Sequence, residues 1–96
     1  MPSQKPFKTI NVSLKGFQRS LKKCAVRGEA TAAIAAMLED PLPVHLKFKK
    51  LNGYRNPALY SITICNNQSH KISFEIRDEV AILRRVGTHK QIDDNP

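Results

Sequence analysis

The strongest constraint on the fold of this chain is a change of hydrophobic period at residues 40–43, which read Asp-Pro-Leu-Pro. A helix cannot continue through this segment, because each proline lacks a backbone N–H and its ring clashes with the preceding turn. Before the segment, apolar residues recur at helical spacing, and after it they alternate with polar residues as in half-buried strands. The chain is therefore expected to be an α+β protein, with its helices ahead of most of its strands.

Two helices are predicted before the break. Ser13 is of a type that caps helix starts, and apolar residues follow it at i, i+3, i+7 and i+10, namely Leu14, Phe17, Leu21 and Cys24. Gly28 interrupts the pattern, and residues 29–38 resume it with strong helix formers. We expect a helical hairpin. The outer face of its first helix is strongly basic and consists of Lys15, Arg19, Lys22 and Lys23.

Period-two alternation predicts five strands, at residues 7–12, 44–49, 59–65, 70–77 and 80–86. Turn-forming residues at 66–69 and 78–79 separate the last three, and a polar tail follows from residue 87. The expected order is β-α-α-β-β-β-β, with the two helices packed on one face of an antiparallel four- to five-stranded sheet. The other face would be left free. Ninety-six residues suffice for one domain, which we assign to 1–96.

The charge of the chain indicates a polyanionic partner. Sixteen Lys and Arg against eight Asp and Glu give a net charge of +8. For any single strand lysine, an ordinary alternative role is to blunt a sheet edge. Cys24 and Cys65 are isolated, no signal-peptide pattern is seen, and no apolar run approaches the length of a membrane span, so we expect a cytoplasmic protein without membrane contact. The three histidines are too far apart to form a local metal site.

His89 is the best candidate for a general acid or base. It follows Gly87 and Thr88 at the exit of the last predicted strand, where a rigid element can present an accessible side chain. An imidazole titrates near neutral pH and therefore suits proton transfer. The alternative is a surface histidine in a polar tail.

Four segments of the second half resemble the RelE/ParE toxin superfamily. They are Lys50-Leu51-Asn52-Gly53, Leu59–Ile64, His70–Ile76 and Ile82–His89. Members of that superfamily show a leucine-glycine turn, a strand of alternating aromatic and branched residues, a strand that begins with a cation, and a last strand that ends in a Gly-Thr-His-like step. The ending 85–89 is most similar to the YafQ branch, and 60–64 to HigB-like relatives.

The resemblance implies the toxin of a type II toxin–antitoxin pair, a ribosome-dependent mRNA endonuclease. Such an enzyme cuts by attack of a ribose 2′-OH on the adjacent phosphate, without a metal or cofactor. Three residues are implied as catalytic, His89, Lys71 and Arg85. The resemblance also implies RNA contacts at Lys49, before the leucine-glycine turn, and at Arg55, after it. With the other cations of the predicted strands, the expected RNA or phosphate contacts are Lys47, Lys49, Lys50, Arg55 and Arg84. The basic helix face Lys15, Arg19, Lys22 and Lys23 would contact a cognate antitoxin or ribosomal RNA.

The chain departs from the family pattern in three places. Ser61 and Thr63 occupy the strand on which RelE has paired lysines, Lys71 replaces the usual arginine, and Asp93 lies near the place of a terminal aromatic. A lysine lacks the planar fork that suits phosphate oxygens. A second interpretation therefore stays open, in which the protein is a ParE-like gyrase-directed toxin or a non-catalytic basic module that binds nucleic acid or protein. His89 discriminates between the two, because a gyrase-directed relative does not need it.

Overall fold

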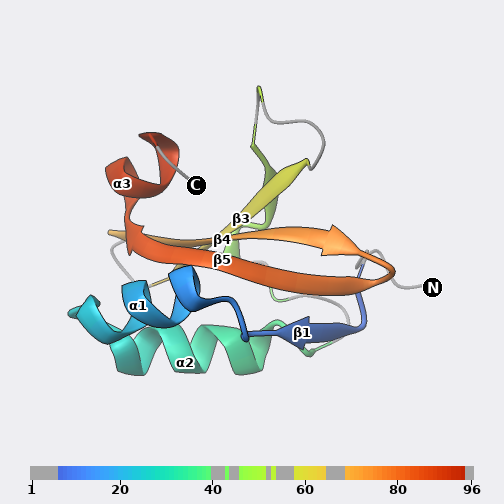
Figure 1. Cartoon of the computed structure of the whole chain (residues 1–96), viewed down its shortest axis with the longest axis horizontal. Helices are drawn as coiled ribbons and strands as arrows, with labels where there is room; N and C mark the ends of the chain where they lie inside the picture. The colour runs from blue at the N-terminus through green and yellow to red at the C-terminus, as the bar shows by residue number, and fades with distance from the viewer. Residues whose placement is uncertain are drawn as a thin grey trace.

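The computed structural model describes residues 7–39, 43, 46–51, 53, 58–64 and 69–94. Over these residues the chain forms a five-stranded mixed sheet in the order β1-β5-β4-β3-β2, together with three helices (Figure 1). The strands are β1 Thr9–Asn11, β2 Lys49–Lys50, β3 Leu59–Ile64, β4 His70–Arg77 and β5 Val80–Thr88. The helices are α1 Lys15–Lys23, α2 Arg27–Ala36 and α3 His89–Asp94. The α+β class predicted from the sequence is confirmed.

The expectation of a wholly antiparallel sheet is wrong at one edge. Strands β2 to β5 pair antiparallel, whereas β1 runs parallel to β5, with Thr9 opposite Val80 and Asn11 opposite Ile82. Parallel neighbours need a long crossover connection, and here nearly seventy residues separate β1 from β5 in the sequence. Periodicity identifies a strand, but it does not identify its partner.

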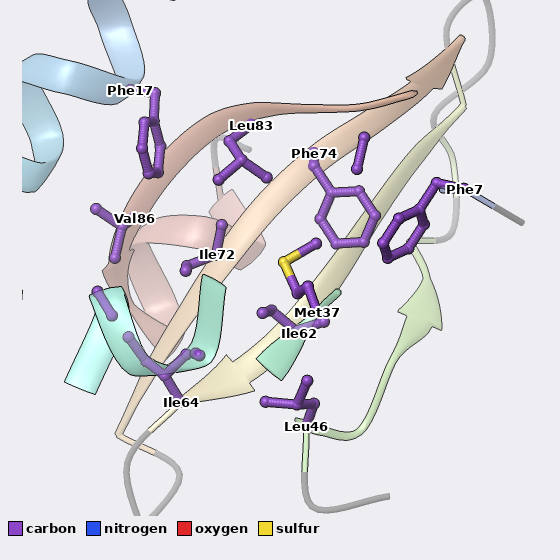
Figure 2. Close-up of a cluster of buried hydrophobic side chains, with 13 residues drawn as sticks. Phe7, Phe17, Met37, Leu46, Ile62, Ile64, Ile72, Phe74, Leu83 and Val86 are labelled. Carbon is purple, nitrogen blue, oxygen red and sulfur yellow. The ribbon is translucent and has the colours of Figure 1, made fainter. Parts of the chain in front are cut away.

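One face of the sheet carries the hydrophobic core, and α1 and α2 lie on this face (Figure 2). Phe17 of α1 and Ala30 and Ala33 of α2 are buried there. The sheet supplies residues that alternate along each strand, except that a bulge in β5 puts Val86 three positions after Leu83. These residues are Ile62, Ile64, Ile72, Phe74, Ala81, Leu83 and Val86. Full burial of one such Leu, Ile or Phe side chain is worth about 1.5–3 kcal/mol, so this face accounts for much of the stability of the fold.

Both predicted helix starts need correction. The N-cap of α1 is Leu14, which has no capping side chain, and the hydroxyl of Ser13 instead donates to Oδ1 of Asn11 at 2.6 Å. Gly28 lies inside α2 and does not separate the helices; the break falls at residues 24–26. Gly28 is exposed in the first turn of α2, and no atom of the described residues would contact a Cβ there.

The strand predicted at 44–49 is reduced to β2 among the described residues; Val44 and His45 lie outside them, as does Cys65 at the end of the next predicted strand. Lys47 has φ of 49°, in the left-handed region, which interrupts the extended backbone just before β2. The last strand extends two residues further than predicted, to Thr88.

The polar tail expected after residue 87 contains α3, and this helix covers part of the sheet face that was expected to be free. In Figure 1, α3 lies on the side of the sheet opposite α1 and α2. Its one apolar residue, Ile92, is fully buried. No helix among the described residues has the length and apolar character needed to cross a membrane.

Candidate functional site

A layer of buried polar side chains lies on the sheet face opposite the core. All of the buried polar residues within the described ranges belong to it, namely Ser61 and Thr63 of β3 and Lys71, Ser73 and Glu75 of β4. They alternate along each strand with the core residues and therefore point to the other side of the sheet. Burying polar groups costs free energy unless they are hydrogen-bonded, and the hydroxyl of Ser61 has no partner among the described residues. The unsatisfied Ser61 hydroxyl makes this layer a candidate functional surface.

One cross-strand row of this face has a cation predicted to bind phosphate at each of its two ends. Lys49 is opposite Ser61, Ser61 opposite Ser73, and Ser73 opposite Arg85. Residues directly opposite each other project from the same face. Lys49 and Arg85 thus stand at the two ends of a row that spans three strand spacings, or roughly 14 Å.

The other predicted phosphate contacts are placed less favourably. Lys50 pairs with Tyr60, whose ring packs against the core, so Lys50 belongs to the opposite face of the sheet from Lys49. Arg84 lies at a bulge in β5, and its Nη1 donates to Oε1 of Glu75 at 3.2 Å. Glu75 therefore already offsets part of the Arg84 charge. Lys47 is exposed in the irregular segment before β2, and Arg55 lies outside the described residues.

His89 is held at the junction of β5 and α3. Its backbone N–H donates to the carbonyl of Ser69 at 3.0 Å, and its side chain is 53% exposed. The helix begins here because Thr88 and Gln91 form a capping box: the Thr88 N–H donates to Oε1 of Gln91 at 2.9 Å, and the Gln91 N–H donates to Oγ1 of Thr88 at 3.2 Å. Gly87 makes room for this contact, because a Cβ there would stand 2.7 Å from Oε1 of Gln91.

The Asp93 carboxylate connects His89 to Lys71. Nδ1 of His89 lies 2.8 Å from Oδ2 of Asp93, and Nζ of Lys71 donates to Oδ1 at 3.1 Å. Burial raises the pKa of Asp93, but the hydrogen bond and positive charge of Lys71 outweigh this effect. His89 and Lys49 add to the lowering, so the pKa of Asp93 lies below the ordinary 3.8. The carboxylate is thus ionised at neutral pH and surrounded by cations.

The position of Lys71 differs from the one implied by the resemblance. Its side chain is only 2% exposed, beneath α3, and its ammonium is bound to Asp93. In this arrangement Lys71 cannot touch a phosphate at the surface. The structure therefore brings His89, Lys71 and Arg85 to one face of the sheet, but it exposes His89 and buries Lys71.

The predicted contacts on α1 are separate from this site. Lys15, Arg19, Lys22 and Lys23 are all exposed on a helix that packs against the core face. The sheet therefore stands between the basic face of α1 and the polar layer (Figure 1).

Asp93 is the site residue that sequence reasoning missed. A signal was present, because Thr88-His89-Lys90-Gln91 matches a capping box and thereby predicts a helix. In a helix, residues 89 and 93 are neighbours at i, i+4.

Comparisons of this chain with models of protein families, with curated proteins and with solved structures give no match.

Proposed function

We propose that this protein is an RNA endonuclease of the toxin type, in which His89 transfers a proton and Arg85 and Lys49 hold the scissile phosphate. Support comes from the resemblance of residues 50–53, 59–64, 70–76 and 82–89 to the RelE/ParE superfamily and from the net charge of +8. The observation that carries the proposal is the half-exposed His89 at the edge of a polar sheet face that also holds these two cations.

The reaction requires little beyond these groups. The ribose 2′-oxygen attacks the adjacent phosphorus, the bond from phosphorus to the 5′-oxygen breaks, and the products are a 2′,3′-cyclic phosphate and a 5′-hydroxyl end. One proton leaves the 2′-OH and one is added to the departing 5′-oxygen, and His89 carries out one of these transfers. Arg85 and Lys49 stabilise the negative charge that grows on the phosphate oxygens. Because the 2′-OH is the nucleophile, the substrate is RNA.

The cellular setting of the proposal follows from the resemblance. The substrate is mRNA on the ribosome, the result is inhibition of translation in the cytoplasm, and the protein is neutralised by a cognate antitoxin. The basic face of α1, on the far side of the sheet from His89, is available for ribosomal RNA or for the antitoxin without occupying the polar layer.

One observation favours a second candidate, a basic module that binds RNA or protein without cutting. Burial of Lys71 removes from the surface a cation that the resemblance implies at the phosphate. The same experiment separates the two candidates, because a binding module has no need of a proton-transfer group.

The test is induced expression of His89→Ala beside wild type and Lys90→Ala, an exposed neighbour on the same helix. Loss of a general acid or base lowers a rate by about 10²–10⁴-fold, so His89→Ala should relieve growth arrest and mRNA cleavage, whereas Lys90→Ala should not. Equal folding is checked by circular dichroism. A folded His89→Ala protein that arrests growth as wild type does would refute the catalytic proposal and support the binding module.

A further inference from the structure

We infer that Asp93 is a positioning residue, anchored from beneath by Lys71, which holds the His89 ring with Nε2 directed to the substrate. The inference rests on the proposed function and gives two residues of its site roles that differ from what the resemblance implies. Asp93 lies near the place where the family pattern has an aromatic, and Lys71 is too deeply buried to contact RNA.

Asp93 determines which ring nitrogen of His89 carries the hydrogen. An ionised carboxylate can only accept hydrogen bonds, and Asp93 is ionised at neutral pH. At 2.8 Å from Oδ2, the Nδ1 atom of His89 must therefore carry the hydrogen. In the neutral ring this leaves Nε2 without a hydrogen and able to accept a proton, which is the tautomer that an orienting aspartate enforces in the Ser-His-Asp triad.

Lys71 holds the Asp93 carboxylate in place. Asp93 lies near the end of a six-residue helix and is 40% exposed, so on its own it would be poorly ordered. Lys71 removes this freedom, because its ammonium donates to Oδ1 from a side chain that is itself only 2% exposed. The Lys71 position is set by the sheet, between Thr63 of β3 and Gly87 of β5. The order of a central strand is thereby passed through Asp93 to His89.

The positive charges near Asp93 compensate its negative charge, which would otherwise repel RNA. An ionised aspartate beside a proton-transfer histidine would repel an RNA phosphate. Lys71 and Lys49 both act on Asp93, one through a hydrogen bond and one through its charge alone. Two cations around one anion leave this group of three with a net positive charge even when His89 is neutral. Lys71 thus compensates Asp93 from beneath, and the surface stays attractive to phosphate.

The decisive experiment reads the tautomer of His89 by ¹⁵N NMR on the whole protein without RNA, at a pH where the ring is neutral. Free neutral imidazole side chains favour hydrogen on Nε2, whereas wild type should carry it on Nδ1. Asp93→Asn should abolish this preference, Lys71→Met should weaken it, and Asp94→Asn, an exposed neighbour on α3, should leave it unchanged. A wild-type ring with its hydrogen on Nε2, or an unchanged ring in Asp93→Asn, would overturn the inference.

Kinetics provide the second readout. Because an orienting aspartate is worth up to about 10⁴-fold in the Ser-His-Asp triad, Asp93→Asn should lower the single-turnover cleavage rate at least about tenfold. Its RNA affinity should not fall, since the residue does not bind substrate and the substitution removes a negative charge. An Asp93→Asn protein that cuts as fast as wild type would refute the inference and leave the proposed function standing. A wild-type protein that cuts no RNA would refute the proposed function, while the tautomer measurement would still decide the role of Asp93.

Discussion

Lys71 has two possible roles in the site, as a phosphate contact or as a buried partner of Asp93. If it bound phosphate, replacement by the arginine usual in the family would be harmless or favourable, because guanidinium matches phosphate geometry. In the structure it is a buried point charge with one carboxylate partner. A compact ammonium on a flexible stem occupies that position, and a wider planar guanidinium would have to enter the same buried space.

We therefore expect Lys71→Arg to destabilise the protein by about 1–3 kcal/mol, the usual cost of overfilling a packed site, and to slow RNA cleavage. Urea denaturation and a cleavage assay measure the two effects. The matched control is the exposed Lys90→Arg, which should change neither. Arginine at position 71 that preserves stability and raises activity would restore the phosphate-binding role.

The carboxyl group of Asp93 gives a pH prediction. Because its pKa is lowered in the folded state, its contribution to the docking of α3 is fully present above about pH 3.8 and is lost as the pH falls through the folded-state pKa. A ¹³C titration of the carboxyl carbon should show an apparent pKa below 3.8, and in Lys71→Met the value should rise. Docking of α3 that weakens already between about pH 7 and pH 5 would conflict with this assignment.

At the scale of elements, α3 is the segment on which the site depends. A helix of six residues is not stable alone, so it relies on the capping box of Thr88 and Gln91, on the burial of Ile92 and on the Asp93 bridge. It begins at His89, directly after the Thr88 cap, so His89 and Asp93 lie one turn apart.

Thr88→Ala should remove the cap and destabilise α3 locally by about 0.5–2 kcal/mol. Hydrogen exchange should show faster exchange at the Gln91 amide, with protection in β4 and β5 unchanged, and cleavage should slow because His89 loses its support. Thr31→Ala, in the interior of α2, is the control and should leave α3 unaffected. Unchanged exchange at Gln91 in Thr88→Ala would show that the capping box does not hold this helix.

Strand β4 was predicted from the sequence, whereas helix α3 and the pairing of β1 were not. Residues 70–77 were predicted as a strand with the observed bounds, because three large apolar residues alternate with polar ones between clear turn signals. Helix α3 was missed because it has one apolar residue and no hydrophobic period, although its capping box was legible. The parallel pairing of β1 and the burial of Lys71 both depend on contacts between distant parts of the chain, which local patterns do not encode.

At the scale of the whole molecule, two groups of cations among the described residues lie on opposite sides of the sheet. The polar layer with His89 lies on one side of the sheet, and the basic face of α1 lies on the other. On α1, Lys15 and Arg19, and likewise Arg19 and Lys23, are at i, i+4 spacing and repel each other by a few tenths of a kcal/mol. A polyanion bound to this face would offset the repulsion.

We expect Arg19→Glu combined with Lys23→Glu to weaken co-sedimentation with ribosomes and to make it less sensitive to salt, because each lost phosphate contact lowers the slope of log affinity against log salt by about 0.7–0.9. The tautomer of His89 should not change, since the sheet separates the two surfaces. Unaltered ribosome binding and unaltered antitoxin binding in this variant would show that the basic face of α1 is only solvated.

The most direct test of the proposed RNA cleavage by 2′-OH attack is the chemistry of the cut ends. Ribosome-bound mRNA is incubated with the protein, the cut is mapped, and the reaction is repeated with the nucleotide on its 5′ side replaced by its 2′-deoxy form. We expect a 2′,3′-cyclic phosphate and a 5′-hydroxyl end from wild type, no cleavage at the 2′-deoxy position, and no cleavage by His89→Ala. Cleavage of the 2′-deoxy substrate, or ends carrying a 3′-hydroxyl and a 5′-phosphate, would contradict the proposed cleavage.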